Sequence, residues 1–284
     1  MKFAITGAAG MLGTDTTQTL QRLGHDVVAW TRHDLDATDG TAAHAMITAI
    51  APDVVVNCAA FTAVDACETD RSSAFAGNET AARNVAAACL ASRSRLIHIS
   101  TDYVFDGTKI EPYTETDPTN PLSVYGESKL AGETAVLETL GPDATVIRTS
   151  WLCGQHGPNM VNTVLRLVDA TGPLRFVSDQ RGCPTFSADL AETIELLATT
   201  QAAGIFHVTN QGAVSWYEFV AEIVAQAGGD VSRVEPIPTS ALQPPRPAPR
   251  PRNSVLDNAA MRSAGLPMLD DYRLALSRLI ATLQ

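Results

Sequence analysis

The sequence predicts an α/β fold of the Rossmann type, with a doubly wound parallel sheet and a smaller C-terminal substrate-binding lobe. Two observations predict this fold. Segments typical of strands alternate with segments typical of helices through the first half of the chain. A glycine-rich turn joins the first strand segment to the first helix segment. Such alternation requires right-handed crossovers between parallel strands.

Local signals place each element of the first half. Gly24 ends the first predicted helix, and Pro52 follows the second. The segment DVVVNCA is continuously apolar, as in a strand that is buried on both faces. The predicted strands are Lys2–Thr6, Asp26–Trp30, Asp53–Ala59, Arg95–Ser100 and Ala144–Thr149, and the predicted helices are Gly10–Leu23, Thr41–Ile50, Ser73–Ala91 and Val124–Thr139.

The alternation weakens beyond Trp151. We expect a strand over residues 204–209 that rejoins the sheet. We therefore expect a cofactor-binding domain over residues 1–150 and a substrate-binding lobe built mainly from residues 151–284. Further helices are expected at Met160–Asp169, Ser187–Thr199, Trp216–Ala227 and Asp271–Leu283.

One segment has a biased composition. Residues 236–251 hold seven prolines, with Arg246 and Arg250 among them and Arg252 directly after. Two interpretations remain open: an extended surface loop, or a cationic loop that closes over a phosphorylated ligand.

Composition excludes several classes of protein. With 45% hydrophobic and 18% charged residues over 284 positions, the chain is neither disordered nor a membrane protein. Its net charge of -11 argues against binding to nucleic acid. The N-terminal segment MKFAITGAAGMLG lacks the apolar run of a signal peptide, so we expect a cytoplasmic protein. The five cysteines and six histidines show no spacing typical of a transition-metal site.

The segment Thr6–Gly13, TGAAGMLG, is typical of a dinucleotide-binding turn. Gly7 permits the tight turn, and Gly10 allows the backbone to approach a pyrophosphate. Gly13 lets the helix pack closely on the sheet, and the helix N-terminus faces the anion. We therefore predict a nicotinamide dinucleotide as cofactor.

The end of the second predicted strand favours NADPH over NADH. The segment Trp30-Thr31-Arg32-His33 contains no carboxylate that would bind ribose hydroxyls. Arg32 can pair with a 2′-phosphate instead, although a solvated surface position is the alternative. Asp36 follows and can accept a hydrogen bond from the adenine amino group.

Tyr125 and Lys129 form a candidate catalytic pair. In the motif YGESK they stand four residues apart on a predicted helix, so both side chains lie on one face. A free tyrosine has a pKa of about 10, and we expect the ammonium to lower it. Thr101 ends a predicted strand, where its hydroxyl can polarise a substrate carbonyl. Ser100 is the alternative, but strand alternation points it away.

Several motifs together resemble the extended short-chain dehydrogenase/reductases, and within them the dTDP-4-dehydrorhamnose reductase family. The resemblance covers essentially the whole chain. The motifs are TGAAGMLG, PDVVVNCAAFTAVDACE, ISTDYVFDG, PYTETDPTNPLSVYGESKLAGE, RTSWLCG, VSDQRGCPT, GIFHVTNQGAVSWYEF and RPRNSVLDN.

The resemblance implies a role for each matching residue. Tyr125 would be the proton donor, and Lys129 would bind the nicotinamide ribose and tune Tyr125. Trp151 would border the sugar pocket, with an ordinary core position as the alternative. The other implied roles are pyrophosphate binding by Met11 and Leu12, contact with the nicotinamide half by Ala59, Ala60 and Thr62, and sugar binding by Thr101 and Asp102.

The chain departs from the family pattern at several positions. Cys153 and Met160 stand where aromatic residues are common, and Thr31 replaces a carboxylate found in some members. Some members are described as using magnesium at a dimer contact built from carboxylates. Asp15 and Glu192 lie near comparable positions, so magnesium and a homodimer stay open.

The implied activity is NADPH-dependent reduction of dTDP-4-dehydro-L-rhamnose to dTDP-L-rhamnose. A 4-ketoreductase for another dTDP-6-deoxysugar fits the same residues. A sugar dehydratase would need a second carboxylate after Asp102, where Tyr103 stands. A non-catalytic regulator resembling that of methionine adenosyltransferase is a third reading, against which the intact Tyr125, Lys129 and Thr101 argue.

Overall fold

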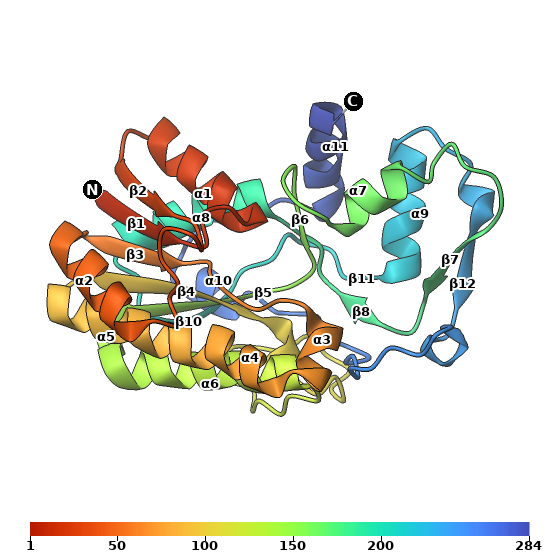
Figure 1. The fold of residues 1–284 in the computed structure, drawn as a ribbon. Helices are drawn as coiled ribbons and strands as arrows, with labels where there is room; N and C mark the ends of the chain where they lie inside the picture. Colours follow the sequence, from red (N-terminus) through yellow and green to blue (C-terminus); the bar gives the residue numbers. More distant parts are fainter. Residues whose placement is uncertain (284) are drawn as a thin grey trace.

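A six-stranded parallel sheet organises the computed structural model, which describes residues 1–283. The strand order is β10-β5-β4-β3-β1-β2 (Figure 1), which confirms the Rossmann-type prediction. From β1 the chain adds β2 on one side of the sheet and then β3 on the other, so the strand order reverses between β1 and β3. Ligands bind in the crevice beyond the carboxyl ends of the strands at such a point. The bounds are β1 (Lys2–Thr6), β2 (Asp26–Trp30), β3 (Val54–Asn57), β4 (Arg95–Thr101), β5 (Ala144–Thr149) and β10 (Gly204–His207).

Helices cover both faces of the sheet (Figure 1). One core packs α2 (Gly40–Ile50), α5 (Ala81–Ser92) and α6 (Val124–Leu140) against the first face. A second core packs α1 (Met11–Arg22), α8 (Ser187–Thr199) and α10 (Ala259–Ser263) against the other. Burial on both faces accounts for the apolar composition of the central strands.

The segment between β3 and α5 differs from the prediction. The predicted span Ser73–Ala91 is helical throughout, but it is not a regular α-helix: α4 (Arg71–Phe75) passes through a π-helical turn η1 (Ala76–Thr80) into α5, and a separate helix α3 (Val64–Thr69) precedes it. Asn78 in this turn accepts a hydrogen bond from the Phe61 amide at 2.8 Å and donates to the Ser128 hydroxyl at 2.9 Å. These long-range bonds stabilise the wider turn, which residue spacing does not report.

The second lobe packs around its own core, to the right of the sheet in Figure 1. Its helices are α7 (Met160–Leu165), α9 (Trp216–Gln226) and α11 (Tyr272–Leu283), and the parallel pair β7 (Leu174–Val177) and β12 (Val234–Ile237) lies beside α9. The short pairs are β6 (Leu152–Cys153) with β9 (Thr185–Phe186), and β8 (Arg181–Gly182) with β11 (Val214–Ser215). Strands of two residues are too short for a periodic sequence signal.

The proline-rich segment is anchored at several points. It begins in β12 and the 3-10 turn η5 (Thr239–Ala241). Arg250 then forms a two-nitrogen ion pair with Asp65 of α3. The Arg252 carbonyl accepts a hydrogen bond from the Arg181 amide at 2.8 Å. The segment therefore connects the second lobe to the sheet domain.

Among residues 1–283, no helix is long and apolar enough to span a membrane.

Gly132 tests the packing of α6. A Cβ at this position would overlap the Asn78 carbonyl oxygen in η1. Gly132→Ala should lower the free energy of unfolding by about 1–3 kcal/mol, although alanine is the better helix former. Gly40→Ala is the control, because its Cβ would meet the movable side chain of Asn84. Urea unfolding of both variants checks this, and equal stability of the two would contradict it.

Candidate active site

The glycine turn shapes the entrance to α1. Gly7 has φ +67, and a Cβ there would lie 2.7 Å from the Ala59 amide nitrogen. A Cβ at Gly13 would overlap the Gly7 carbonyl oxygen, so the helix cannot pack this closely with a larger residue. Gly10 is the N-cap of α1, and no side chain caps the helix there. The first amides of α1 are therefore available to an anion.

A cleft of about 480 Å³ opens at this turn. It lies at the carboxyl end of β1 and β3, where the sheet topology predicts a ligand. The structure brings six of the predicted cofactor residues together in its lining: Gly7, Gly10, Arg32, Asp36, Ala59 and Ala60. Phe61, Ser73 and Gly77 also line it and were not predicted from the sequence; they come from the loop after β3, from α4 and from the π-helical turn η1.

Two acidic side chains lie near Arg32. Asp34 accepts hydrogen bonds from the Thr31 amide at 2.9 Å and the Thr31 hydroxyl at 2.7 Å, which lower its pKa. Asp36 accepts from Thr38, and the pKa of Asp36 is also lowered. Asp34 is therefore turned back on its own strand end, whereas Arg32 and Asp36 line the cleft.

The remaining predicted cofactor residues lie outside the lining of this cleft. Leu12 is buried in the core between α1 and the sheet. The Met11 side chain lies against Gly154: a Cβ added to Gly154 would be 3.1 Å from the Met11 Cγ. Thr62 is exposed just before α3. Backbone groups of the first turn, rather than these side chains, face the glycine turn.

Tyr125 is positioned by the start of α6. Ser123 caps this helix by accepting a hydrogen bond from the Gly126 amide at 3.2 Å. Gly126 allows α6 to approach the Tyr103 carbonyl, because a Cβ would overlap that oxygen. The Tyr103 ring packs edge-on against Tyr125 with centroids 5.6 Å apart. Tyr103 thus fixes the position of the tyrosine, a role that the sequence did not reveal.

Thr101 and Asp102 lie at the carboxyl end of β4, as predicted. The Thr101 hydroxyl donates to Asp102 Oδ1 at 3.0 Å and accepts from the Tyr103 amide at 3.2 Å. Asp102 Oδ2 is buried and has no hydrogen-bond partner among the described residues. Burial raises the pKa of Asp102 to about 7, against hydrogen bonds from Ser254 and Thr101 that lower it.

The pKa of Tyr125 is raised, not lowered as the sequence suggested. Burial is the main cause, and a hydrogen bond with Thr101 counteracts it. Lys129 is buried as well, and its Nζ donates to the Ile99 carbonyl at 2.6 Å. Burial lowers the pKa of Lys129 to about 8, while Glu133 and Cys58 raise it. Because Cys58 lines the cleft, Lys129 lies next to the predicted cofactor site.

Trp151 lies on the side of the second lobe. It has φ +47, a backbone conformation that is rare for a bulky residue. Its ring stacks on Trp216 with centroids 3.6 Å apart, and a Cβ at Gly182 would overlap the ring. The ring is only partly buried, so both the border of a pocket and the edge of a core describe its position.

Comparison with known proteins identifies the family. The family model described as RmlD substrate binding domain matches residues 1–284. The chain belongs to the dTDP-4-dehydrorhamnose reductase family. A dTDP-4-dehydrorhamnose reductase of Streptomyces griseus is 44% identical over 281 residues, which cover 97% of this chain and 92% of that protein.

Two further members resemble the chain over nearly its whole length. A dTDP-4-keto-6-deoxy-D-glucose reductase of Streptomyces niveus is 42% identical, covering 98% of this chain and 96% of that protein. The crystal structure of a dTDP-4-dehydrorhamnose reductase from Bacillus anthracis, in complex with NADP, superposes with a TM-score of 0.95. That protein is 35% identical, and the match covers 99% of each chain. The resemblance inferred from the motifs is thereby confirmed.

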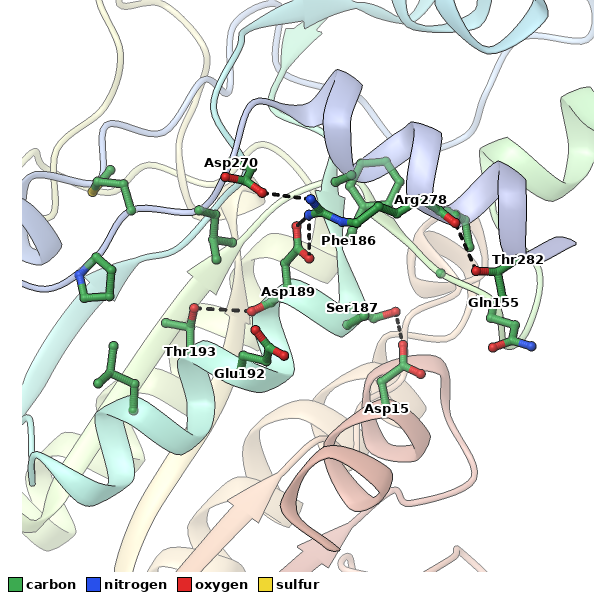
Figure 2. A pocket seen from close by; sticks show the side chains of 18 residues that line it. Asp15, Gln155, Phe186, Ser187, Asp189, Glu192, Thr193, Asp270, Arg278 and Thr282 are labelled. Carbon is green, nitrogen blue, oxygen red and sulfur yellow. Dashed lines mark hydrogen bonds and ion pairs between the residues drawn. The ribbon is translucent and has the colours of Figure 1, made fainter. Parts of the chain in front are cut away.

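Figure 2 shows a second cavity, of about 690 Å³, between α1, α8 and α11. It contains Asp15 and Glu192, the two carboxylates at which the sequence left magnesium binding undecided. Ser187 donates to Asp15, and Arg22 pairs with Glu192 at 2.9 Å. Arg278 pairs with the neighbouring Asp189 at 3.0 Å.

The partners of these carboxylates leave magnesium open. Each carboxylate has a hydroxyl or guanidinium partner, and a Mg²⁺ ion that bound here would have to share or displace these partners to obtain oxygen ligands in octahedral geometry. Among residues 1–283, no three Asp, Glu, His or Cys side chains come together as metal ligands.

Asp102 makes the stability of the protein depend on pH. In the folded protein the pKa of Asp102 is about 7, above the ordinary value of 3.8, so folding favours the protonated carboxyl group. The free energy of unfolding therefore falls as the pH rises from about 4 towards 7. Asp102→Asn cannot ionise. The unfolding free energy of the variant relative to wild type should therefore rise by at least about 1 kcal/mol between pH 5 and pH 8. Urea unfolding at both pH values measures it, and a constant difference would contradict the assignment.

Proposed function

We propose that the protein reduces the 4-keto group of dTDP-4-dehydro-L-rhamnose to give dTDP-L-rhamnose. The observation that carries the proposal is the meeting of Thr101, Asp102 and Tyr125 at the end of β4, with Lys129 next to the dinucleotide cleft. The family comparisons support this substrate class, because the related proteins are named as reductases of dTDP-linked keto sugars.

The cleft fits NADPH. The first amides of α1, from Met11 and Leu12, would hold the pyrophosphate, because no side chain caps them. Arg32 would pair with the 2′-phosphate, and Asp36 would accept from the adenine amino group. When bound, NADPH supplies the hydride that reduces the carbonyl carbon. Ala59, Ala60 and Thr62 would flank the nicotinamide half, and Lys129 would bind its ribose.

Tyr125 acts as the proton donor in this proposal. The phenol is protonated at neutral pH, so a proton is available when negative charge develops on the carbonyl oxygen. The Thr101 side chain acts on the pKa of Tyr125 and would hold the same oxygen. The Lys129 ammonium stabilises the phenolate that remains after transfer.

The sugar and its diphosphate would bind between the two lobes. Asp102 Oδ2 is buried without a partner, so it suits a sugar hydroxyl as donor. Trp151 would border the sugar. Arg246 and Arg250 act on Tyr103, whose ring packs against Tyr125. Arg250 also pairs with Asp65, so Arg246 is the cation that best suits the substrate diphosphate. This favours the cationic interpretation of the proline-rich segment, and we propose that residues 151–284 mainly form the substrate lobe.

The reaction can be tested by following reduced nicotinamide absorbance with enzymatically generated dTDP-4-dehydro-L-rhamnose. We expect turnover and dTDP-L-rhamnose by NMR, whereas a product with the opposite configuration at carbon 4 would indicate another dTDP-6-deoxysugar.

Tyr125→Phe should lower kcat by about 10²–10⁴-fold with an unchanged Kd for NADPH, because only the proton donor is removed. Tyr217→Phe, on α9, is the control and should behave like wild type. Turnover of Tyr125→Phe near the wild-type rate would contradict the assigned role.

Arg32 tests the cofactor preference. Arg32→Ala should weaken NADPH binding by about 10-fold or more and leave NADH binding nearly unchanged, because only NADPH carries the phosphate. Binding is measured by nicotinamide fluorescence. Arg22→Ala removes the same charge from the far end of α1 and is the control. Equal weakening of both cofactors by Arg32→Ala would show that Arg32 does not recognise the phosphate.

A further inference from the structure

A buried ion pair lies one helical turn beyond Lys129. Glu133 on α6 is 1% exposed, and Arg148 on β5 is 3% exposed. Arg148 donates through Nε and Nη2 to the Glu133 carboxylate, at 3.0 and 2.7 Å. Ser100 donates to the same carboxylate. Neither the cofactor cleft nor the proposed proton transfer uses this pair directly.

The geometry connects Glu133 to the catalytic lysine. Tyr125, Lys129 and Glu133 are each four residues apart, so they share one face of α6. Lys129 bonds to the carbonyl of Ile99, and Glu133 bonds to the hydroxyl of the next residue, Ser100. Two successive residues of β4 therefore bind the ammonium and the carboxylate, which follow one another on the same face of α6.

Stability alone does not account for the pair. Removing two charges from water has a large cost, and buried ion pairs can often be replaced by apolar residues without loss of stability. Arg148 Nη1 is buried and has no hydrogen-bond partner among the described residues. A carboxylate next to Lys129, in contrast, has an obvious electrostatic effect on the ammonium.

We propose that Glu133, held by Arg148 and Ser100, is a positioning residue that keeps Lys129 protonated at the pH of catalysis. The inference rests on the proposed function, in which Lys129 acts as an ammonium ion. Glu133 itself touches neither the predicted cofactor cleft nor the tyrosine, so it acts through the lysine.

Two further groups that interact with Lys129 are uncharged at neutral pH, whereas the Arg148 guanidinium, which pairs with Glu133, is a cation and disfavours the Lys129 ammonium. Cys58 follows β3, and burial raises the pKa of its thiol to about 12. His98 lies on β4, and burial lowers its pKa well below the usual 6.5. Glu133 is the charged group that opposes the effect of burial on Lys129, whose pKa is about 8. Removing the Glu133 charge should therefore release the lysine proton at lower pH.

The pKa of Lys129 can be measured directly, because the chain has only three lysines, Lys2, Lys109 and Lys129. We would label lysine with ¹³C at Cε, assign the signals with Lys2→Arg and Lys109→Arg, and titrate the ligand-free protein by NMR. Glu133→Gln should lower the Lys129 midpoint by about one pH unit or more. No substrate is needed, so a failure of the proposed reaction would be seen separately from a failure of this inference.

Two further variants keep the test decisive. Ser100→Ala removes a hydrogen bond from the same carboxylate without changing its charge, so the midpoint should stay where it is in wild type. Glu133→Gln with Arg148→Gln avoids an unpaired buried guanidinium if the single variant does not fold. Because it also removes a cation that disfavours the Lys129 ammonium, it should lower the midpoint by less than Glu133→Gln alone. An unchanged Lys129 midpoint in folded Glu133→Gln or in the double variant would overturn the proposal.

Discussion

The contact between α6 and β4 determines the geometry of the whole site. Gly126 lets the helix approach the Tyr103 carbonyl, and Gly132 lets it approach η1. Lys129 then reaches the backbone of β4 at Ile99, 2.6 Å away. Because the strand continues directly into Thr101 and Asp102, the same contact sets Tyr125 and Lys129 relative to these two residues. Any shift of α6 would move Tyr125 and Lys129 away from their positions relative to Thr101 and Asp102.

Burial at this contact shifts the pKa values of Tyr125 and Lys129 in opposite directions. It raises the pKa of the Tyr125 phenol and lowers the pKa of the Lys129 ammonium to about 8. A neutral phenol and a cation are the forms that a reductase needs before proton transfer. The buried Glu133 preserves the cation, and the open amides at the start of α1 prepare the neighbouring cleft for an anion. The site is thus set electrostatically before any ligand binds.

Local signals in the sequence were sufficient for the sheet, most helices and the cofactor turn. The placement of Tyr125 and Lys129 on one helix could be predicted because helical spacing is a local property. The π-helical turn and the Arg250–Asp65 pair could not, since they depend on contacts between distant segments. The direction of the Tyr125 pKa shift was also wrong, because the sequence indicated a nearby charge but not the extent of burial. Asp34, which turns back onto Thr31, likewise required the structure.

A crystal structure of the protein with NADP⁺ and dTDP-L-rhamnose would test the central claim most directly. The account predicts that the sugar oxygen on carbon 4 lies within hydrogen-bond distance of both Tyr125 Oη and Thr101 Oγ1, and that Asp102 accepts a bond from a sugar hydroxyl. A sugar bound with carbon 4 away from Tyr125, or a nucleotide sugar that does not enter the space between the lobes, would contradict it.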